Sequence, residues 1–195
     1  MKPTRGTVIA LGLALAAVAA AAGIWSSVSA SSKPWALVPP PASAPSAWEH
    51  LTLPNGTAVL YYPPSMHPVS GDSDAVSAAR LGADGKFLLY LNATPKQGGE
   101  TLRNWSRYRL RVLTGEDASR AALDGAAVDQ RFRGGTGSCV IDHYVTRVDA
   151  HRYTEIACLV QGPSGASVIV AAAPTAMWPS ARAVLAQAVS AYVVR

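Results

Sequence analysis

The hydrophobic and polar positions that follow residue 47 alternate in short runs broken by turn-forming residues. Residues 48–64 hold two such runs around the segment 54–57, whose Asn-Gly pair readily adopts the positive φ angles of a tight hairpin turn. Residues 75–81 and 86–94 form a second pair of runs around a glycine-containing turn. This stretch therefore predicts two β-hairpins.

The period of the pattern changes after residue 98. Side chains of leucine, tryptophan, arginine and valine then recur at intervals of three and four residues, the spacing of one face of an α-helix. We predict a helix from about Gly99 to Leu113, with this stripe turned toward the core. The stripe consists of Leu102, Trp105, Arg109 and Val112.

Alternation returns over residues 126–135 and continues through residues 137–160 and 166–173. Pro179 then marks the start of a last predicted helix, over residues 180–194, because proline is favoured in the first helical turn. Strand pairs, a helix, four consecutive strands and a closing helix predict an α+β domain in which helices pack on an antiparallel β-sheet.

Both cysteines of the chain, Cys139 and Cys158, lie in the predicted hairpin of residues 137–160. If they face each other, residues 147–150 form a four-residue loop, which is an ordinary hairpin length. Directly opposed Cβ atoms lie about 4.5 to 5.5 Å apart, and local twist can bring two thiols to bonding distance. We therefore predict a disulfide, which contributes on the order of 3 kcal/mol in the chain-entropy model.

Two other roles for the cysteines remain open. They could be free buried thiols, or they could hold a metal together with a histidine. The histidine on the same strand face, His143, is four residues from Cys139, which is about 13 Å along a strand. One ligand sphere does not span that distance, so we expect no metal and no other cofactor.

The first thirty residues differ in composition from the rest. Two cations precede an uncharged, alanine-rich run from Gly6 to Ser32. This pattern predicts a signal peptide over residues 1–30 that ends in a Val-Ser-Ala cleavage site, with an uncleaved membrane anchor as the alternative. Either one places the remaining chain outside the cytoplasm, secreted or anchored to the membrane. Residues 31–47, rich in Pro, Ser and Ala, predict a semi-rigid tether to an extracytoplasmic domain at residues 48–195.

The order of elements over residues 48–194 resembles the Mog1/PsbP-like fold, an α/β/α sandwich. Residues 89–105, 131–144 and 152–174 also resemble a family of uncharacterised exported proteins of high-GC Gram-positive bacteria. The resemblance implies a fold and an extracytoplasmic location. It implies no catalytic residue, because one fold hosts unrelated functions.

The same hairpin register places Asp142 directly opposite Glu155, where like charges destabilise a strand pair. Counting back across a turn at residues 134–137, we expect Arg131 to face the same side and to neutralise the pair. Two carboxylates could act as acid and base in an envelope hydrolase. We favour a charge network on an open patch of sheet, because no nucleophile or oxyanion donor converges there in the sequence. Two tyrosines flank the pair: Tyr144 and Tyr153.

Three further arginines recur every four residues on the predicted helix, away from its apolar stripe: Arg103, Arg107 and Arg111. Like charges at this spacing cost a few tenths of a kcal/mol per pair. A solvated polar face could carry alternating positive and negative side chains, whereas this one carries only arginines at these three positions. The stripe is therefore either an ordinary exposed face or a candidate contact surface for an acidic partner or for anionic lipid headgroups.

The overall composition excludes more than it indicates. Charged residues make up 15% of the chain and the formal net charge is +5, which is too mild to indicate a nucleic-acid partner. The four histidines are scattered over predicted hairpins and loops. We therefore expect a non-catalytic extracytoplasmic binding or accessory domain of the cell envelope, which contacts an unknown protein or membrane component. The alternative is the envelope hydrolase that uses Asp142 and Glu155.

Overall fold

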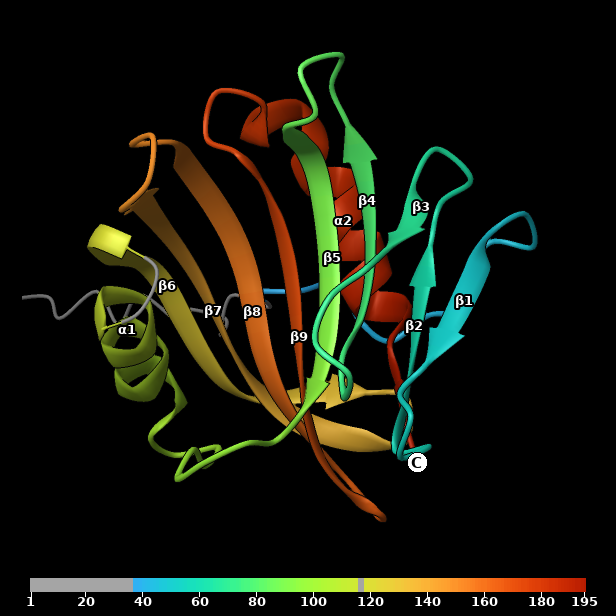
Figure 1. Ribbon diagram of the computed structural model, residues 1–195. Coiled ribbons are helices and arrows are strands. Elements are labelled where there is room, and N and C mark those ends of the chain that lie inside the picture. The colour runs from blue at the N-terminus through green and yellow to red at the C-terminus, as the bar shows by residue number, and fades with distance from the viewer. Residues whose placement is uncertain (1–36, 116–117) are drawn as a thin grey trace, which may run out of the picture. The chain divides into compact units, whose positions relative to one another are not determined.

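The computed structural model describes residues 37–115 and 118–195. The predicted signal peptide or anchor and the first part of the predicted tether lie outside the described residues. Strands and helices follow one another in the predicted order, with two short strands, β3 and β10, added (Figure 1). In chain order the elements are β1 (Glu49–Thr52), β2 (Ala58–Tyr62), β3 (His67–Val69), β4 (Val76–Leu81), β5 (Phe87–Pro95), α1 (Trp105–Gly115), β6 (Ala118–Phe132), β7 (Gly135–Thr146), β8 (Arg152–Gly162), β9 (Gly165–Pro174), α2 (Trp178–Ala191) and β10 (Val193–Val194).

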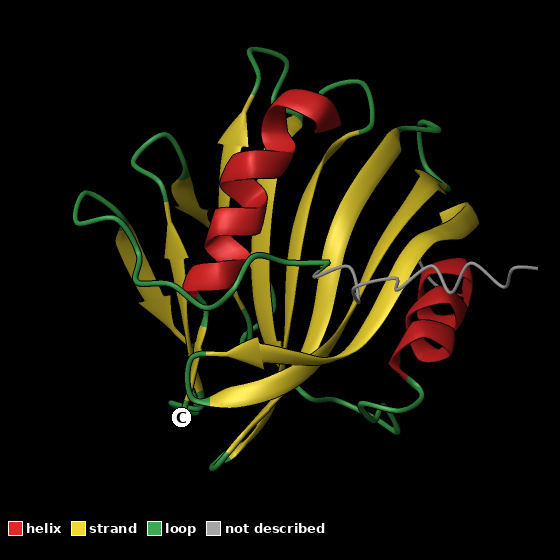
Figure 2. Ribbon diagram, turned by 180° about the vertical axis from the view of Figure 1, so that it is seen from behind, coloured by secondary structure: helices red, strands yellow, loops and turns green. Residues whose placement is uncertain are grey.

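Seven strands form one large sheet in the order β3-β4-β5-β9-β8-β7-β6, and three form a smaller sheet in the order β1-β2-β10. Neighbouring strands run antiparallel in both sheets. The helices α1 and α2 lie on opposite faces of the large sheet (Figure 2). The predicted α+β class, an antiparallel sheet with helices packed on it, is confirmed.

Each face of the large sheet has its own core, because successive side chains of a strand point to opposite faces. Along β8, Ile156, Cys158 and Val160 belong to the core that includes α2 and the small sheet. Their neighbours Ala157 and Leu159 belong to a smaller core under Trp105 of α1. Alternate side chains of the cysteine hairpin thus contribute to the cores on both faces of the large sheet.

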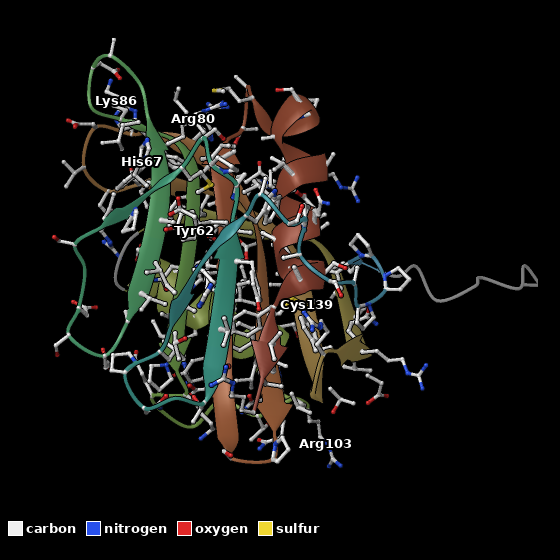
Figure 3. All side chains as sticks on the ribbon, turned by 90° about the vertical axis from the view of Figure 1, so that its right-hand side faces the viewer. Tyr62, His67, Arg80, Lys86, Arg103 and Cys139 are labelled. Atoms are coloured by element: carbon white, nitrogen blue, oxygen red, sulfur yellow. A yellow bond between two sulfur atoms is a disulfide. The ribbon has the colours of Figure 1, made fainter. Side chains whose placement is uncertain are left out.

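The predicted disulfide is confirmed. Cys139 pairs directly with Cys158 across β7 and β8, the two Cα atoms lie 4.1 Å apart, and the sulfur atoms are bonded. Both residues are buried in the α2-side core, and Figure 3 shows Cys139 inside the domain. The predicted four-residue loop is also confirmed, because the Thr146 N–H donates to the His151 carbonyl oxygen at 2.9 Å.

The turn between β6 and β7 lies earlier than predicted. The strands are joined at Arg133 and Gly134, whereas we expected a turn over residues 134–137. Gly134 has a φ of 87°, and a Cβ atom there would overlap the carbonyl oxygen of Val194. Contact with the C-terminal strand therefore places the turn, and the sequence offers no local sign of that contact.

Both helices have ends that differ from the prediction. α1 begins at Trp105, after a turn at residues 101–104 in which the Thr101 N–H donates to Asn104 Oδ1 at 2.7 Å and the Asn104 N–H donates to Thr101 Oγ1 at 3.2 Å. α2 ends at Ala191, since Tyr192 is extended and the next two residues pair with β2. At this end a strand partner far away in the sequence overrides a continuous helical pattern.

Residues 37–47, the described part of the Pro-rich segment, pack on the domain. Val38 is 3% exposed and belongs to the α2-side core. The Ala42 N–H donates to the Ser190 carbonyl oxygen of α2 at 3.1 Å. The packed structure therefore includes residues ahead of Trp48, where we placed the start of the domain.

Candidate functional site

The candidate site is a row of side chains that crosses the large sheet on its α1 face. Strand register aligns Tyr90 of β5, Ala172 of β9, Glu155 of β8 and Asp142 of β7. The predicted opposition of Asp142 and Glu155 is confirmed. Both carboxylates are buried, with exposed fractions of 0% and 1%. Two carboxylates in such a position need compensation for their charge.

The compensating cation is Arg109 of α1. Its Nε donates to Glu155 Oε1 at 2.9 Å, and its Nη2 forms a short ion pair with the same oxygen. The prediction that Arg131 neutralises the pair was wrong. Arg131 is exposed, and strand register places it opposite Thr136, away from the carboxylates. The miscount arose because the β6–β7 turn lies at Arg133 and Gly134, earlier than predicted, which pairs Arg131 with Thr136 instead of a residue near Asp142. A sequence signal was available, since an arginine within the apolar stripe of a helix indicates a buried anionic partner.

The carboxylate oxygens are incompletely hydrogen-bonded. Neither oxygen of Asp142 nor Oε2 of Glu155 has a donor within reach in the described structure. Burial, followed by the charge of Glu155, raises the pKa of Asp142 to about 8. At neutral pH Asp142 is therefore protonated and can donate to Glu155, which pairs with Arg109. One shared proton and one guanidinium thus compensate two buried acids.

Aromatic side chains border this row. Tyr144 and Tyr153 are directly opposed on β7 and β8, and their stacked ring centroids lie 5.8 Å apart. Phe87 and Tyr90 form a second pair at 5.0 Å. Burial and the charge of Glu155 raise the pKa of Tyr144 far above its usual value. The four rings line a cavity of about 630 Å³ beside the β7–β8 loop.

The carboxylate pair itself does not line that cavity. Within residues 37–115 and 118–195, no group of three or more metal-ligating side chains comes together. His143 lies on the other face of β7, where Nδ1 is 2.9 Å from Oδ1 of Asp124 at the surface. The arrangement can hold α1 on the sheet and can place negative charge next to an aromatic cavity.

The predicted arginine stripe is exposed on the outer side of α1. Arg103 lies just ahead of the first residue of α1, at the periphery of the domain in Figure 3. The guanidinium carbon of Arg111 lies 5.1 Å from the ring centroid of Tyr108. Among the described side chains, none of these arginines has an acidic group within ion-pair distance, and Arg107 is likewise exposed. Their role as a contact surface stays a prediction.

No protein-family model matches the chain, and no curated protein matches it. Among solved structures, it is similar to the PsbP protein of the cyanobacterium Synechocystis sp. PCC 6803, with 11% identity and a TM-score of 0.57. The match covers 82% of this chain and 99% of the cyanobacterial one. The domain has a PsbP-like fold.

Two weaker similarities accompany this match. One is to a Pseudomonas aeruginosa protein of unknown function, at 10% identity and a TM-score of 0.45 over 76% of this chain and 97% of that one. The other is to LpqN of Mycobacterium tuberculosis, a protein involved in cell envelope biogenesis, at 12% identity and a TM-score of 0.37 over 80% and 81%. At these TM-scores neither similarity carries an argument about function.

In the part of the chain that the structure describes, neither helix combines the length and the apolar character that crossing a bilayer requires.

Proposed function

We propose that this protein is a non-catalytic, extracytoplasmic binding or accessory domain of the cell envelope, and that it contacts a protein or membrane component through the outer side of α1. One observation carries the proposal: the arginines of this segment divide into two classes. Arg109 turns inward to Glu155, whereas the three arginines of the stripe turn outward without an acidic partner among the described residues.

The outward arginines are not needed to hold the helix. α1 is fixed by Trp105, whose Nε1 donates to the Ala157 carbonyl oxygen at 3.0 Å, and by the ion pair of Arg109. Three exposed cations that contribute little to packing still create a local positive potential, which attracts anionic surfaces over about one Debye length. An acidic protein patch and an anionic lipid headgroup layer both fit this chemistry.

The disulfide supports the extracytoplasmic location. Such bonds form and persist in oxidising compartments and are rare in the cytosol of most cells. The bond between Cys139 and Cys158 lies in the core rather than at a reactive surface, as a structural disulfide does.

The alternative function, an envelope hydrolase, finds less support. A catalytic carboxylate must reach the substrate, or reach it through one water molecule. Asp142 and Glu155 are covered by α1 and by the tyrosines and lie outside the lining of the cavity. Their burial suits a structural role better than proton transfer to a ligand.

The test replaces Arg103, Arg107 and Arg111 together by glutamate. A matched control replaces three exposed arginines elsewhere by glutamate and so makes the same change in net charge: Arg131, Arg152 and Arg182. Cosedimentation with phosphatidylglycerol vesicles measures lipid binding, and crosslinking in native membranes followed by mass spectrometry measures protein contacts.

We expect the stripe variant to lose one of these two interactions and the control to keep it. The interaction should also weaken between 0.1 M and 1 M salt, as the Debye length falls from about 10 Å to about 3 Å. Equal binding by the wild type, the stripe variant and the control would refute the proposed surface.

A further inference from the structure

The aromatic cavity beside the β7–β8 loop is separate from the outer side of α1. We propose that this cavity binds an organic ammonium ion, held by the faces of its four aromatic rings and by the negative charge of the neighbouring carboxylate row. The inference does not depend on the arginine stripe, so the two proposals stand or fail by different experiments.

The rings provide the first part of the site. An aromatic face carries partial negative charge and attracts a cation that lies within about 6 Å of the ring centroid. The pairs Tyr144–Tyr153 and Phe87–Tyr90 come from three strands, β5, β7 and β8, and border one cavity of about 630 Å³. This volume lies in the usual range for small-molecule sites. Phe87 lines the cavity and is 38% exposed, so its ring is accessible to a ligand.

The carboxylate row provides the second part. Asp142 and Glu155 lie two positions along β7 and β8 from Tyr144 and Tyr153, on the same face, which corresponds to about 7 Å. Three of their four oxygens accept no hydrogen bond, and one guanidinium, that of Arg109, compensates them. At neutral pH the shared proton and Arg109 neutralise the pair, so a cation among the tyrosines would lie next to negative charge once Asp142 releases its proton.

The other cations near the cavity are already engaged. Arg147 donates to the carbonyl oxygens of Thr114 and Gly115 at the end of α1. Lys86 Nζ lies 3.6 Å from Asp84 Oδ2, and His151 Nε2 lies 3.9 Å from Asp149 Oδ2. Asp84 also contributes, after burial, to raising the pKa of Tyr153. Arg147 keeps its positive charge and lines the cavity, where Asp149, which also lines it, offsets that charge, so the aromatic rings remain the main attraction for an added cation.

Cation binding must be linked to the proton on the carboxylate pair. A positive charge about 7 Å away favours the ionised form of Asp142, so binding releases a proton when Asp142 is protonated beforehand. Because the pKa of Asp142 is about 8, affinity should rise between pH 6 and pH 9. Coulomb's law with an effective dielectric constant of about 20 to 40 makes the rise on the order of tenfold. The charged or titratable groups that act on Asp142 are Glu155 of β8, Arg109 of α1 and, from the other face, Asp124 of β6, and Asp142 in turn acts on Tyr144 of β7.

The first experiment compares choline with 3,3-dimethylbutan-1-ol, its uncharged isostere, by isothermal titration calorimetry on the folded protein. Choline should bind with a dissociation constant in the millimolar range or below, and the isostere at least tenfold more weakly. Equal affinity for the two compounds would show an apolar pocket only and would overturn the proposal, as would an absence of choline binding at 100 mM. Phosphatidylcholine vesicles tested in parallel distinguish a lipid headgroup from a free solute as the source of the cation.

The second experiment uses matched variants. Tyr144→Leu and Tyr153→Leu keep apolar volume but remove the ring, and each should lose choline binding at least tenfold. Tyr144→Phe and Tyr153→Phe keep the ring and should bind within about threefold of the wild type. Circular dichroism confirms that each variant is folded. Equal losses in the Leu and Phe variants would overturn the assignment of the rings.

The third experiment tests the linkage through Asp142→Asn, which cannot ionise. The wild type should bind choline on the order of tenfold more tightly at pH 9 than at pH 6, whereas the affinity of the variant should be independent of pH. The same pH dependence in both proteins would separate the carboxylate row from the site and overturn that part of the proposal. If the Asn variant does not fold, proton release by the wild type, measured in buffers of different ionisation enthalpy, decides the same point.

Discussion

Each face of the β7–β8 hairpin buries a directly opposed pair of side chains, but the chemistry of the two pairs differs. On the α2 face, Cys139 and Cys158 are joined covalently inside an apolar core. Three positions further along, on the α1 face, Asp142 and Glu155 are opposed in the same way and depend on a guanidinium and a shared proton. The disulfide pair is insensitive to pH, whereas the charge of the carboxylate pair depends on pH.

The difference lies in the groups that each face buries. Leu60 of the small sheet and Leu185 of α2 pack in the core that holds the disulfide, and Cys139 also borders a cavity of about 720 Å³. α1 packs over β6, β7 and β8, and the aromatic residues beyond it border an open cavity. Both faces contribute stability, but only the α1 face keeps titratable groups in a position where a ligand could change their charge. Four changes test this contrast, in order of decreasing expected effect.

Replacing Arg109 by methionine should have the largest effect, because it leaves the buried carboxylate pair without its cation. We expect a loss of about 3 to 5 kcal/mol in the free energy of unfolding at pH 7, measured by urea denaturation. Arg107→Met on the outer side of the same helix is the control and should change stability by less than about 0.5 kcal/mol. Equal effects of the two changes would mean that the ion pair seen at Glu155 contributes nothing.

Replacing Cys139 and Cys158 together by alanine should lower the free energy of unfolding by about 2 to 4 kcal/mol. A reducing agent should destabilise the wild type by a similar amount and leave the double variant unchanged. Alkylation of the folded, unreduced protein should label neither cysteine. Quantitative labelling of both thiols would contradict the disulfide.

The carboxylate pair should make stability depend on pH in a defined direction. An unfolded aspartate has a pKa of about 4, and the folded value for Asp142 is about 8. Between these values the folded state holds a proton that the unfolded state has released, so stability is greatest below about pH 4 and falls as the pH rises to about 8.

We expect this contribution to fall by about 1 to 2 kcal/mol between pH 6 and pH 8, measured by urea denaturation at each pH. Asp142→Asn should remove that part of the slope, since an amide does not titrate. The disulfide variant should keep it, because the cysteines lie on the other face. Identical slopes in the wild type and the Asn variant would refute the raised pKa.

Reversing the charge of the arginine stripe should have the smallest effect on stability, within about 1 kcal/mol. The variant exchanges one row of like charges for another at the same spacing, and the side chains make few packing contacts. Thermal unfolding followed by circular dichroism measures the change. A loss of several kcal/mol would show that these arginines hold the helix in place.

The sequence predicts the features that depend on local pattern. Alternation and turn residues identified the order of elements, and the spacing of Cys139 and Cys158 sufficed to derive the register that also opposes Asp142 and Glu155. Register along β6 could not be counted, because its three bulges leave no mark in the alternation. The role of Arg109 was also missed, since its partner lies in a strand far away in the sequence.

Part of the aromatic cavity could be predicted from the sequence. Tyr144 and Tyr153 follow from the hairpin register, whereas Phe87 and Tyr90 join them only because β9 lies between β5 and β8 in the sheet. That strand order depends on tertiary packing and is not encoded in the spacing of any short segment.

The pairing of β10 with β2 has a consequence for how fast the domain can form. Val193 and Val194 complete the small sheet on Val59 and Ala58, and the Val194 N–H also donates to the Arg133 carbonyl oxygen at 2.9 Å. Contacts between segments so distant in sequence form late, because the intervening chain must first lose its conformational freedom. β2 can pair early with the neighbouring β1, but its other edge gains a strand partner only from a segment more than a hundred residues further along the chain.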